Sequence, residues 1–277
     1  MSDTFARSTF NADVSAKRCL ALRRRILEMS QTVSALHIAG AFSCLEMVEM
    51  IYFHFMRRAG KESPDTFLLS KGHGCLSQYT SLEMLGILQR SDIEGYCKPG
   101  GFLGTHPDYR VKAGIEASTG SLGHGLTMAI GMAYADKLDG KDRDVYVVMS
   151  DGELQEGSVW EGILLAPALK VNRLTAFVDC NDFQSLGRTS ETYPNFYPVP
   201  EKLRAFGWEC VEINGHSATE IHRAVTSREG TRPLMIVGRT TKGRGVSYME
   251  NVPIWHYRSP SPAEYQQAIE GLREVRG

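Results

Sequence analysis

Residues 145–184, VYVVMSDGELQEGSVWEGILLAPALKVNRLTAFVDCNDFQ, have the pattern of a strand, a helix and a second strand. The β-branched and apolar run Val145–Met149 ends at an Asp-Gly turn signal and is too short for a helix, so it predicts a buried strand. Glu153–Lys170 has apolar residues at helical spacing and ends on a basic residue, which the helix macrodipole favours. Leu174–Cys180 is a second strand-like run. The right-handed crossover of such a βαβ unit places the carboxyl ends of both strands at one edge of the sheet.

Two oxygen-bearing side chains follow these strand ends, Asp151 and Asn181. A carboxylate and an amide oxygen at the carboxyl edge of a parallel sheet suit Mg²⁺, which completes its shell with waters and ligand phosphates. Backbone N–H groups at Gly152 and Glu153, where the helix is expected to begin, would add affinity for a diphosphate. Taken alone, an Asp-Gly at a strand end is most often only a turn.

The segment Ser150–Glu153, followed roughly thirty residues later by Asn181-Asp182, resembles the thiamin diphosphate signature of transketolases and 2-oxo acid dehydrogenases. The resemblance implies that Asp151, Asn181 and the backbone carbonyl of Phe183 hold Mg²⁺ on the diphosphate. Ser150 and Asp182 depart from the usual residues of that family. Neither departure removes an oxygen that would bind the metal.

The composition is that of a globular chain without an electrostatic preference for nucleic acid or membranes. The 277 residues are 42% hydrophobic and have a formal net charge of −1, and they could form one large α/β domain or two small ones. The resemblance implies a single pyrophosphate-binding domain over residues 1–277. No apolar stretch reaches transmembrane length, and the N-terminus lacks the apolar core of a signal peptide. The six cysteines form no C-x-x-C pair, which argues against zinc and disulfides. These features favour a cytoplasmic protein with reduced thiols.

Three histidines lie in small-residue loops. Such histidines are often structural, but each of these segments is similar to a transketolase segment. The loop around His37 resembles the one whose histidine faces the thiazolium and the sugar, and the Lys71–Gly74 run places His73 at the diphosphate. Residues 96–114 are too long for a simple connection and predict an active-site loop, in which His106 matches a substrate histidine.

The glycine-rich segment Gly120–Gly125 precedes an amphipathic helix that runs to Leu138. On its own it would be a tight turn into a helix. It is not a P-loop or a Rossmann fingerprint, because the required residues and spacing are missing. The resemblance implies that Gly120 and Leu122 contact the pyrimidine of the cofactor.

Strands and helices continue to alternate, which predicts an α/β fold with a parallel sheet flanked by helices on both faces, the thiamin diphosphate-binding fold. Further helices are expected at Asp13–Val33, Ser43–Met56 with Ser43 as N-cap, and Ala218–Ser227, further strands at Phe67–Ser70, Trp208–Ile213 and Leu234–Val237, and irregular chain at Thr192–Pro200. After the last strand, Thr240–Val246 and Trp255-His256 are similar to transketolase motifs. There His256 would reach both the diphosphate and the substrate.

The resemblance covers nearly the whole chain and identifies it as similar to the N-terminal, pyrophosphate-binding part of a transketolase. That family passes a two-carbon ketol unit from a ketose, or its phosphate, to an aldose. In the family a second α/β domain supplies the glutamate that protonates the aminopyrimidine, and no such domain fits before residue 277. We therefore expect one half of a split transketolase, whose C-terminal half is a separate chain, with two copies of each chain in the assembly.

Three alternatives remain open at this point. The α subunit of a 2-oxo acid dehydrogenase shares the metal signature, but His37, His106 and His256 favour ketol transfer. A 1-deoxyxylulose phosphate synthase is similar at Gly120–Gly125 but is a much longer fused chain. A non-catalytic thiamin diphosphate-binding scaffold would not need the histidines on the substrate side.

Overall fold

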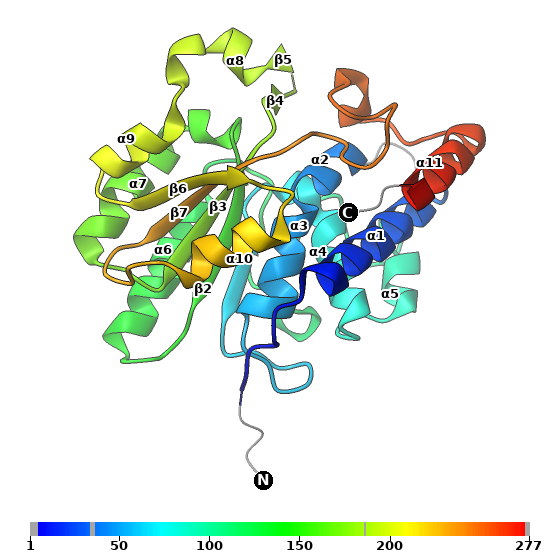
Figure 1. Cartoon of the computed structure of the whole chain (residues 1–277). Helices are drawn as coiled ribbons and strands as arrows, with labels where there is room; N and C mark the ends of the chain where they lie inside the picture. Colours follow the sequence, from blue (N-terminus) through cyan, green and yellow to red (C-terminus); the bar gives the residue numbers. More distant parts are fainter. Residues whose placement is uncertain (1–4, 34–36, 186, 275–277) are drawn as a thin grey trace.

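A five-stranded, fully parallel sheet forms the centre of the computed structural model, which describes residues 5–33, 37–185 and 187–274 (Figure 1). The strand order is β1, β2, β3, β7, β6. The strands are β1 Thr66–Leu69, β2 Val145–Ser150, β3 Leu174–Cys180, β6 Glu209–Asn214 and β7 Leu234–Arg239. The predicted α/β fold with a parallel sheet is confirmed.

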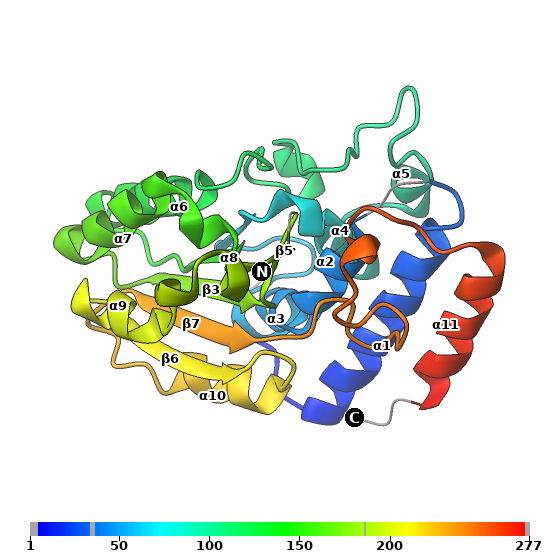
Figure 2. The same ribbon diagram turned by 90° about the horizontal axis from the view of Figure 1, so that it is seen from above.

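Helices cover both faces of the sheet, as Figure 2 shows from above. One layer consists of α6 Gly125–Leu138, α7 Gly157–Leu169 and α9 Val199–Ala205. The opposite layer consists of α2 Ile38–Ser43, α3 Leu45–Met50, α4 Cys75–Met84 and α10 Ala218–Thr226, with α1 Ala12–Met29 and α11 Pro262–Glu274 packed outside it. The short helices α5 Arg90–Glu94 and α8 Thr189–Thr192 and the hairpin of β4 Phe183–Gln184 and β5 Gly187–Arg188 lie in connections.

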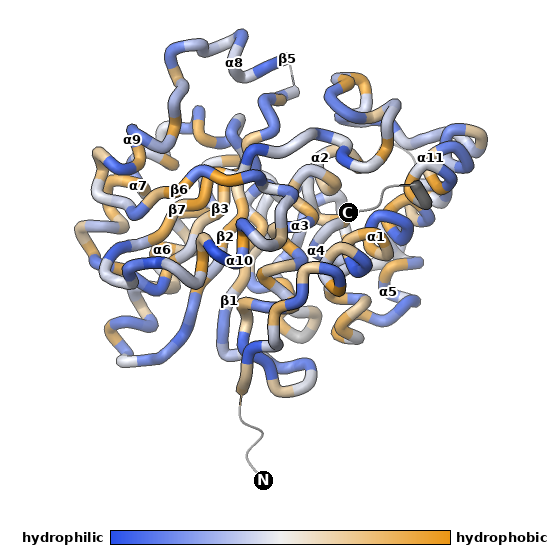
Figure 3. The backbone as a smooth tube through the Cα atoms, viewed as in Figure 1, coloured by the Kyte–Doolittle hydropathy of each residue, from blue (hydrophilic) through white to orange (hydrophobic). Residues whose placement is uncertain are grey.

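The central strands are apolar because both of their faces are covered (Figure 3). In β2, Tyr146 and Val148 pack towards α3 and α4, whereas Val147 and Met149 pack towards α6 and α7. This period of two is the pleat of a strand buried on both faces. No helix in the described ranges is long and apolar enough to cross a membrane.

The predicted helix Glu153–Lys170 is wrong at its start. Glu153–Gln155 form a single 3₁₀ turn, Glu156 is extended, and α7 begins only at Gly157. The physical reason is the buried carboxylate of Glu153, which accepts hydrogen bonds from the Ser70 hydroxyl and, at 3.0 Å, from the Gly123 N–H. These long-range contacts hold the segment against β1 and the loop before α6, so it does not continue into α7.

The predicted N-cap at Ser43 is also wrong. The helical segment begins at Ile38, and the Ser43 hydroxyl donates to Gly40 O at 3.1 Å and to Asp179. Two smaller differences lie elsewhere. Helix α1 ends at Met29 instead of Val33, because the hydroxyls of Ser30 and Thr32 donate back to carbonyls of its last turn. The segment 192–200, predicted to be irregular, runs into α9, whose first turn contains Pro200.

Candidate active site

Four segments of the predicted site follow strand ends at one edge of the sheet. They are residues 70–74 after β1, 151–153 after β2, 181–183 after β3 and 240–243 after β7. Strands β2 and β3 end in register, since Ser150 pairs with Asp179 and the Asp151 N–H donates to Asp179 O at 3.2 Å. The side-by-side placement of the segments after β2 and β3 is therefore confirmed.

The residues predicted to bind metal are linked to one another. The Asp151 carboxylate accepts from the Asp182 N–H at 2.6 Å and from the Gly152 N–H at 2.9 Å. The Asn181 Oδ1 accepts from the Phe183 N–H at 3.0 Å. A Cβ on Gly152 would lie 3.8 Å from the Phe183 carbonyl oxygen, so this oxygen lies beside the residue that follows Asp151.

Asp151 is fully buried, and no ion pair to it is found among the described residues. Burial, followed by the nearby charge of Asp179, raises the pKa of Asp151 to about 7. The donors around it are neutral, including the Thr189 hydroxyl at 3.3 Å and the Tyr197 phenol at 3.4 Å. A buried carboxylate without a counter-charge, beside an amide and a carbonyl oxygen, fits a hard cation.

The predicted histidines come together in one cluster, centred on His37. Its ring centroid lies 5.8 Å from that of His73, 6.1 Å from that of His106 and 5.6 Å from that of His256. His73 and His256 are 5.9 Å apart. The ring of Tyr257 packs against His37, with 4.7 Å between centroids. Segments separated by more than two hundred residues thus form one surface.

This cluster is short of negative charge. Lys242 is 3% exposed, its ammonium is hydrogen-bonded to His256 Nδ1, and it makes no ion pair with the described residues. Burial and the neighbouring Lys71 lower the pKa of Lys242 to about 8. Burial, with His106 and Lys242, lowers the pKa of His37 to about 4, and burial with Lys242 lowers that of His256 to about 3. An anion bound here would relieve the repulsion, so the cluster fits a phosphate group.

Two glycines keep the backbone close to the cluster. Gly120 has a φ of +130°, and a Cβ there would lie 2.8 Å from the His106 ring. A Cβ on Gly72 would lie 2.8 Å from Gly120 N. Beside them, the Thr119 hydroxyl oxygen is buried without a hydrogen-bond partner in the described structure. Both turns therefore require glycine, and the orphan hydroxyl is available to a ligand.

Two residues predicted to bind the cofactor, Leu122 and Glu153, do not belong to the histidine cluster or to the predicted metal ligands. Leu122 is half-buried in the loop before α6, and the Glu153 carboxylate is occupied by Ser70 and Gly123. Their contact with a cofactor stays a prediction. Sequence reasoning left out Lys71 and Lys242 as site residues, although both lie in glycine-containing motifs directly after a strand, which was the available signal.

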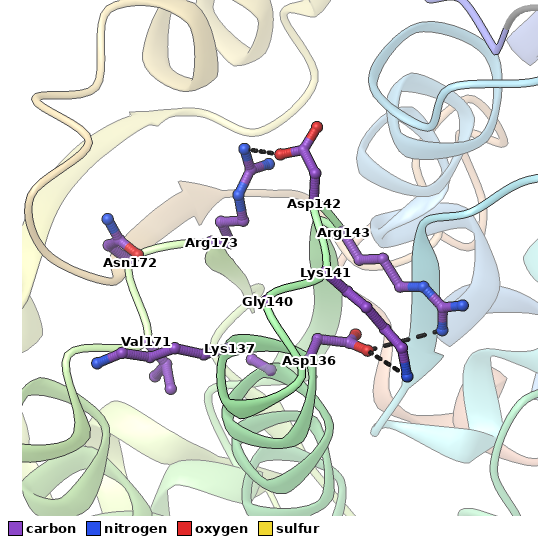
Figure 4. Close-up of a pocket in the computed structure, with 10 residues that line it drawn as sticks. Asp136, Lys137, Gly140, Lys141, Asp142, Arg143, Val171, Asn172 and Arg173 are labelled. Carbon is purple, nitrogen blue, oxygen red and sulfur yellow. Dashed lines mark ion pairs between the residues drawn. The ribbon is translucent and has the colours of Figure 1, made fainter.

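A separate cavity of about 320 Å³ lies at the opposite edge of the sheet, before β2 and β3 (Figure 4). Three of its cations pair with carboxylates, Arg173 with Asp142, and Lys141 and Arg143 with Asp136, whereas the Lys137 ammonium donates to Leu169 O at 2.8 Å. Most of its charged side chains are thus paired with one another, unlike Lys242 in the histidine cluster.

Unpaired buried charges of both signs, at the carboxyl edge of a parallel α/β sheet, define a domain that binds a phosphate-bearing cofactor. Comparison with known proteins agrees. The family described as transketolase, thiamine diphosphate binding domain, matches residues 14–259. The chain belongs to the transketolase family and carries its thiamine diphosphate-binding domain.

Relatives of similar length are themselves named as single subunits of transketolases. One from Phocaeicola vulgatus, a subunit of an apulose-4-phosphate transketolase, is 36% identical over 258 residues, which cover 91% of each chain. One from a Clostridium species, a subunit of a 6-deoxy-6-sulfo-D-fructose transketolase, is 34% identical over 91% of this chain and 94% of that protein.

Full-length transketolases are more than twice as long. The transketolase of Homo sapiens is 33% identical over 92% of this chain but only 42% of its own length. The crystal structure of Campylobacter jejuni transketolase has the same fold, with a TM-score of 0.86, 23% identity and coverage of 95% of this chain and 43% of that chain. This chain thus spans less than half of the full-length enzymes.

Proposed function

We propose that this chain is the cofactor-binding half of a two-chain transketolase, which transfers a two-carbon ketol unit from a ketose, or its phosphate, to an aldose, or its phosphate. The observation that carries the proposal is the placement of unpaired Asp151 and unpaired Lys242 at the same sheet edge as the cluster of His37, His73, His106 and His256. The similarity in length to proteins named as transketolase subunits supports it.

In this proposal Asp151, Asn181 and the Phe183 carbonyl would hold Mg²⁺, and His73 and Lys242 would hold the diphosphate, while the Gly152 N–H donates to Asp151. When bound, thiamin diphosphate supplies the thiazolium carbon that carries the two-carbon unit. The fit rests on the donor set, since carboxylate, amide and carbonyl oxygens are what Mg²⁺ prefers.

The remaining histidines, His37, His106 and His256, belong to the sugar side. With a pKa of about 4 and about 3, His37 and His256 are neutral near pH 7 in the absence of a bound anion. A neutral imidazole donates one hydrogen bond and accepts another, so it can orient a sugar hydroxyl or move a proton between hydroxyl and carbonyl oxygens. These residues bind and orient the substrate beside the cofactor.

A partner chain is part of the proposal. Large apolar side chains around the cluster are exposed: Tyr109 and Val111 after His106, and Ile254 and Tyr257 on either side of His256 are each more than half exposed. Such a rim would be covered by a second chain, and we propose two copies of each chain in the assembly. The six free thiols support a reducing, cytoplasmic location.

The Lys242→Met variant tests the anion site. Because Lys242 loses its charge as the pH rises through about 8, thiamin diphosphate affinity of the wild-type complex should fall over the same range. Removing the charge should lower affinity at pH 7 by about tenfold and flatten this pH dependence. Both effects would be measured by calorimetric titrations at pH values from about 6.5 to about 9, spaced roughly half a pH unit apart. Equal affinities and equal pH profiles for the two proteins would contradict the assignment.

A further inference from the structure

Behind the proposed metal site, the buried carboxylate of Asp179 at the end of β3 collects four side-chain donors. Its Oδ2 accepts from the Ser43 hydroxyl, the Lys71 ammonium and the Asn181 Nδ2, and its Oδ1 accepts from the Thr240 hydroxyl. These donors come from α2 and from the segments that follow β1, β3 and β7. One carboxylate therefore joins the segments that carry the site.

The amide of Asn181 lies between two groups with fixed roles. On one side Asp179 is an ionised carboxylate, which only accepts hydrogen bonds, and its Oδ2 is 3.0 Å from Asn181 Nδ2. On the other side the backbone N–H of Phe183 only donates, and it lies 3.0 Å from Asn181 Oδ1. Turning the amide over would place donor against donor and acceptor against acceptor. Only one orientation satisfies both neighbours.

We infer that Asp179 is a positioning residue for the cofactor metal, because it holds the Asn181 amide with its oxygen turned away from Asp179 and towards Phe183. The inference rests on the proposed function, in which Asn181 supplies an oxygen to Mg²⁺. Lys71 supplies the positive charge that balances Asp179. It pairs with Asp179 and also donates to Gly40 O at 2.9 Å, so the charge of Asp179 is neutralised, whereas no ion pair to Asp151 is found among the described residues.

The Asp179→Asn variant should allow the Asn181 amide to adopt either orientation, since an asparagine at 179 can present either a donor or an acceptor to it. The matched control is Thr240→Val, which also removes one hydrogen bond from Asp179 but leaves the acceptor that faces Asn181. A second change, Asn181→Asp in the Asp179→Asn background, makes orientation irrelevant, because a carboxylate presents oxygen whichever way it turns.

The experiment is a calorimetric titration of Mg²⁺ into the complex of this chain with its co-purifying partner, at saturating thiamin diphosphate, together with melting temperatures. Asp179→Asn should weaken Mg²⁺ binding by at least about tenfold and Thr240→Val by less than about threefold, in the range seen for residues that orient metal ligands. The Asp179→Asn/Asn181→Asp double variant should return the affinity to within about threefold of the wild type. A merely structural role would lower the melting temperature of both single variants and their Mg²⁺ affinity alike.

Equal Mg²⁺ affinities for Asp179→Asn and Thr240→Val, or no recovery in the double variant, would overturn the inference. If Asp179→Asn alone does not fold because Lys71 loses its partner, Lys71→Met/Asp179→Asn takes its place in the same comparison. A wild-type complex without magnesium-dependent cofactor binding would instead overturn the proposed function, and this inference with it.

Discussion

The Asp151→Asn variant is expected to lower magnesium-dependent affinity for thiamin diphosphate by at least about tenfold, on the order of 1.4 kcal/mol. The substitution removes the negative charge and keeps only one acceptor oxygen, whereas the N–H groups of Gly152 and Asp182 donate to different oxygens of the Asp151 carboxylate. In the absence of cofactor, the melting temperature should stay close to that of the wild type, because the loss of one accepted hydrogen bond offsets the relief of a buried carboxylate without a counter-charge. Calorimetry and thermal unfolding measure the two effects separately.

Asp144→Asn is the control, for which we expect a change in stability but no change in cofactor affinity. Asp144 is also buried, but it lies at the other end of β2 and pairs with Arg7 and Arg173. Its replacement should lower the melting temperature and leave cofactor affinity unchanged. If Asp151→Asn bound the cofactor as well as the wild type with the same magnesium dependence, Asp151 would not be a metal ligand.

His37→Ala and His106→Ala should each reduce kcat/KM for ketol transfer by at least about a hundredfold, the usual contribution of a positioned acid or base. Cofactor affinity should change little, because these side chains act mainly on the reacting sugar. His73→Ala should first weaken cofactor binding. Steady-state kinetics of the assembled enzyme, combined with calorimetry, would separate the two groups.

His222→Ala provides the matched control for these substitutions. His222 lies on α10 and stacks on Phe10, with 4.2 Å between ring centroids, away from the cluster. It should have no effect on kcat/KM. Unchanged kcat/KM in both His37→Ala and His106→Ala would assign those histidines to the structure alone.

The parts of the fold predicted from the sequence are those where local pattern and burial agree. Strand β3 was predicted with its exact bounds, because Leu174–Cys180 is apolar throughout most of its length and buried on both faces. The placement of His37, His73, His106 and His256 at one site was predicted from the resemblance of their segments to transketolase motifs, because only His73 directly follows a strand.

The features that could not be predicted depend on contacts between distant residues. The Lys71–Asp179 ion pair joins positions 108 residues apart, and neither residue type is expected in a core until its partner is known. The break between Glu153 and α7 likewise follows from Ser70 and Gly123, which lie far away in the sequence. The lack of an ion-pair partner at Asp151 and Lys242 can be recognised only after the pairings of the surrounding charges are known.

The most direct test of the split-enzyme account is to purify this chain free of any other polypeptide and then to add back the chain that co-purifies with it. Ketol transfer between several ketose and aldose phosphates would be measured with Mg²⁺ and thiamin diphosphate present throughout. Oxidative decarboxylation of 2-oxo acids with an artificial electron acceptor serves as the comparison assay. The account predicts no transfer by the chain alone, transfer by the two chains together, and no decarboxylation by either. Robust ketol transfer by the isolated chain would contradict it.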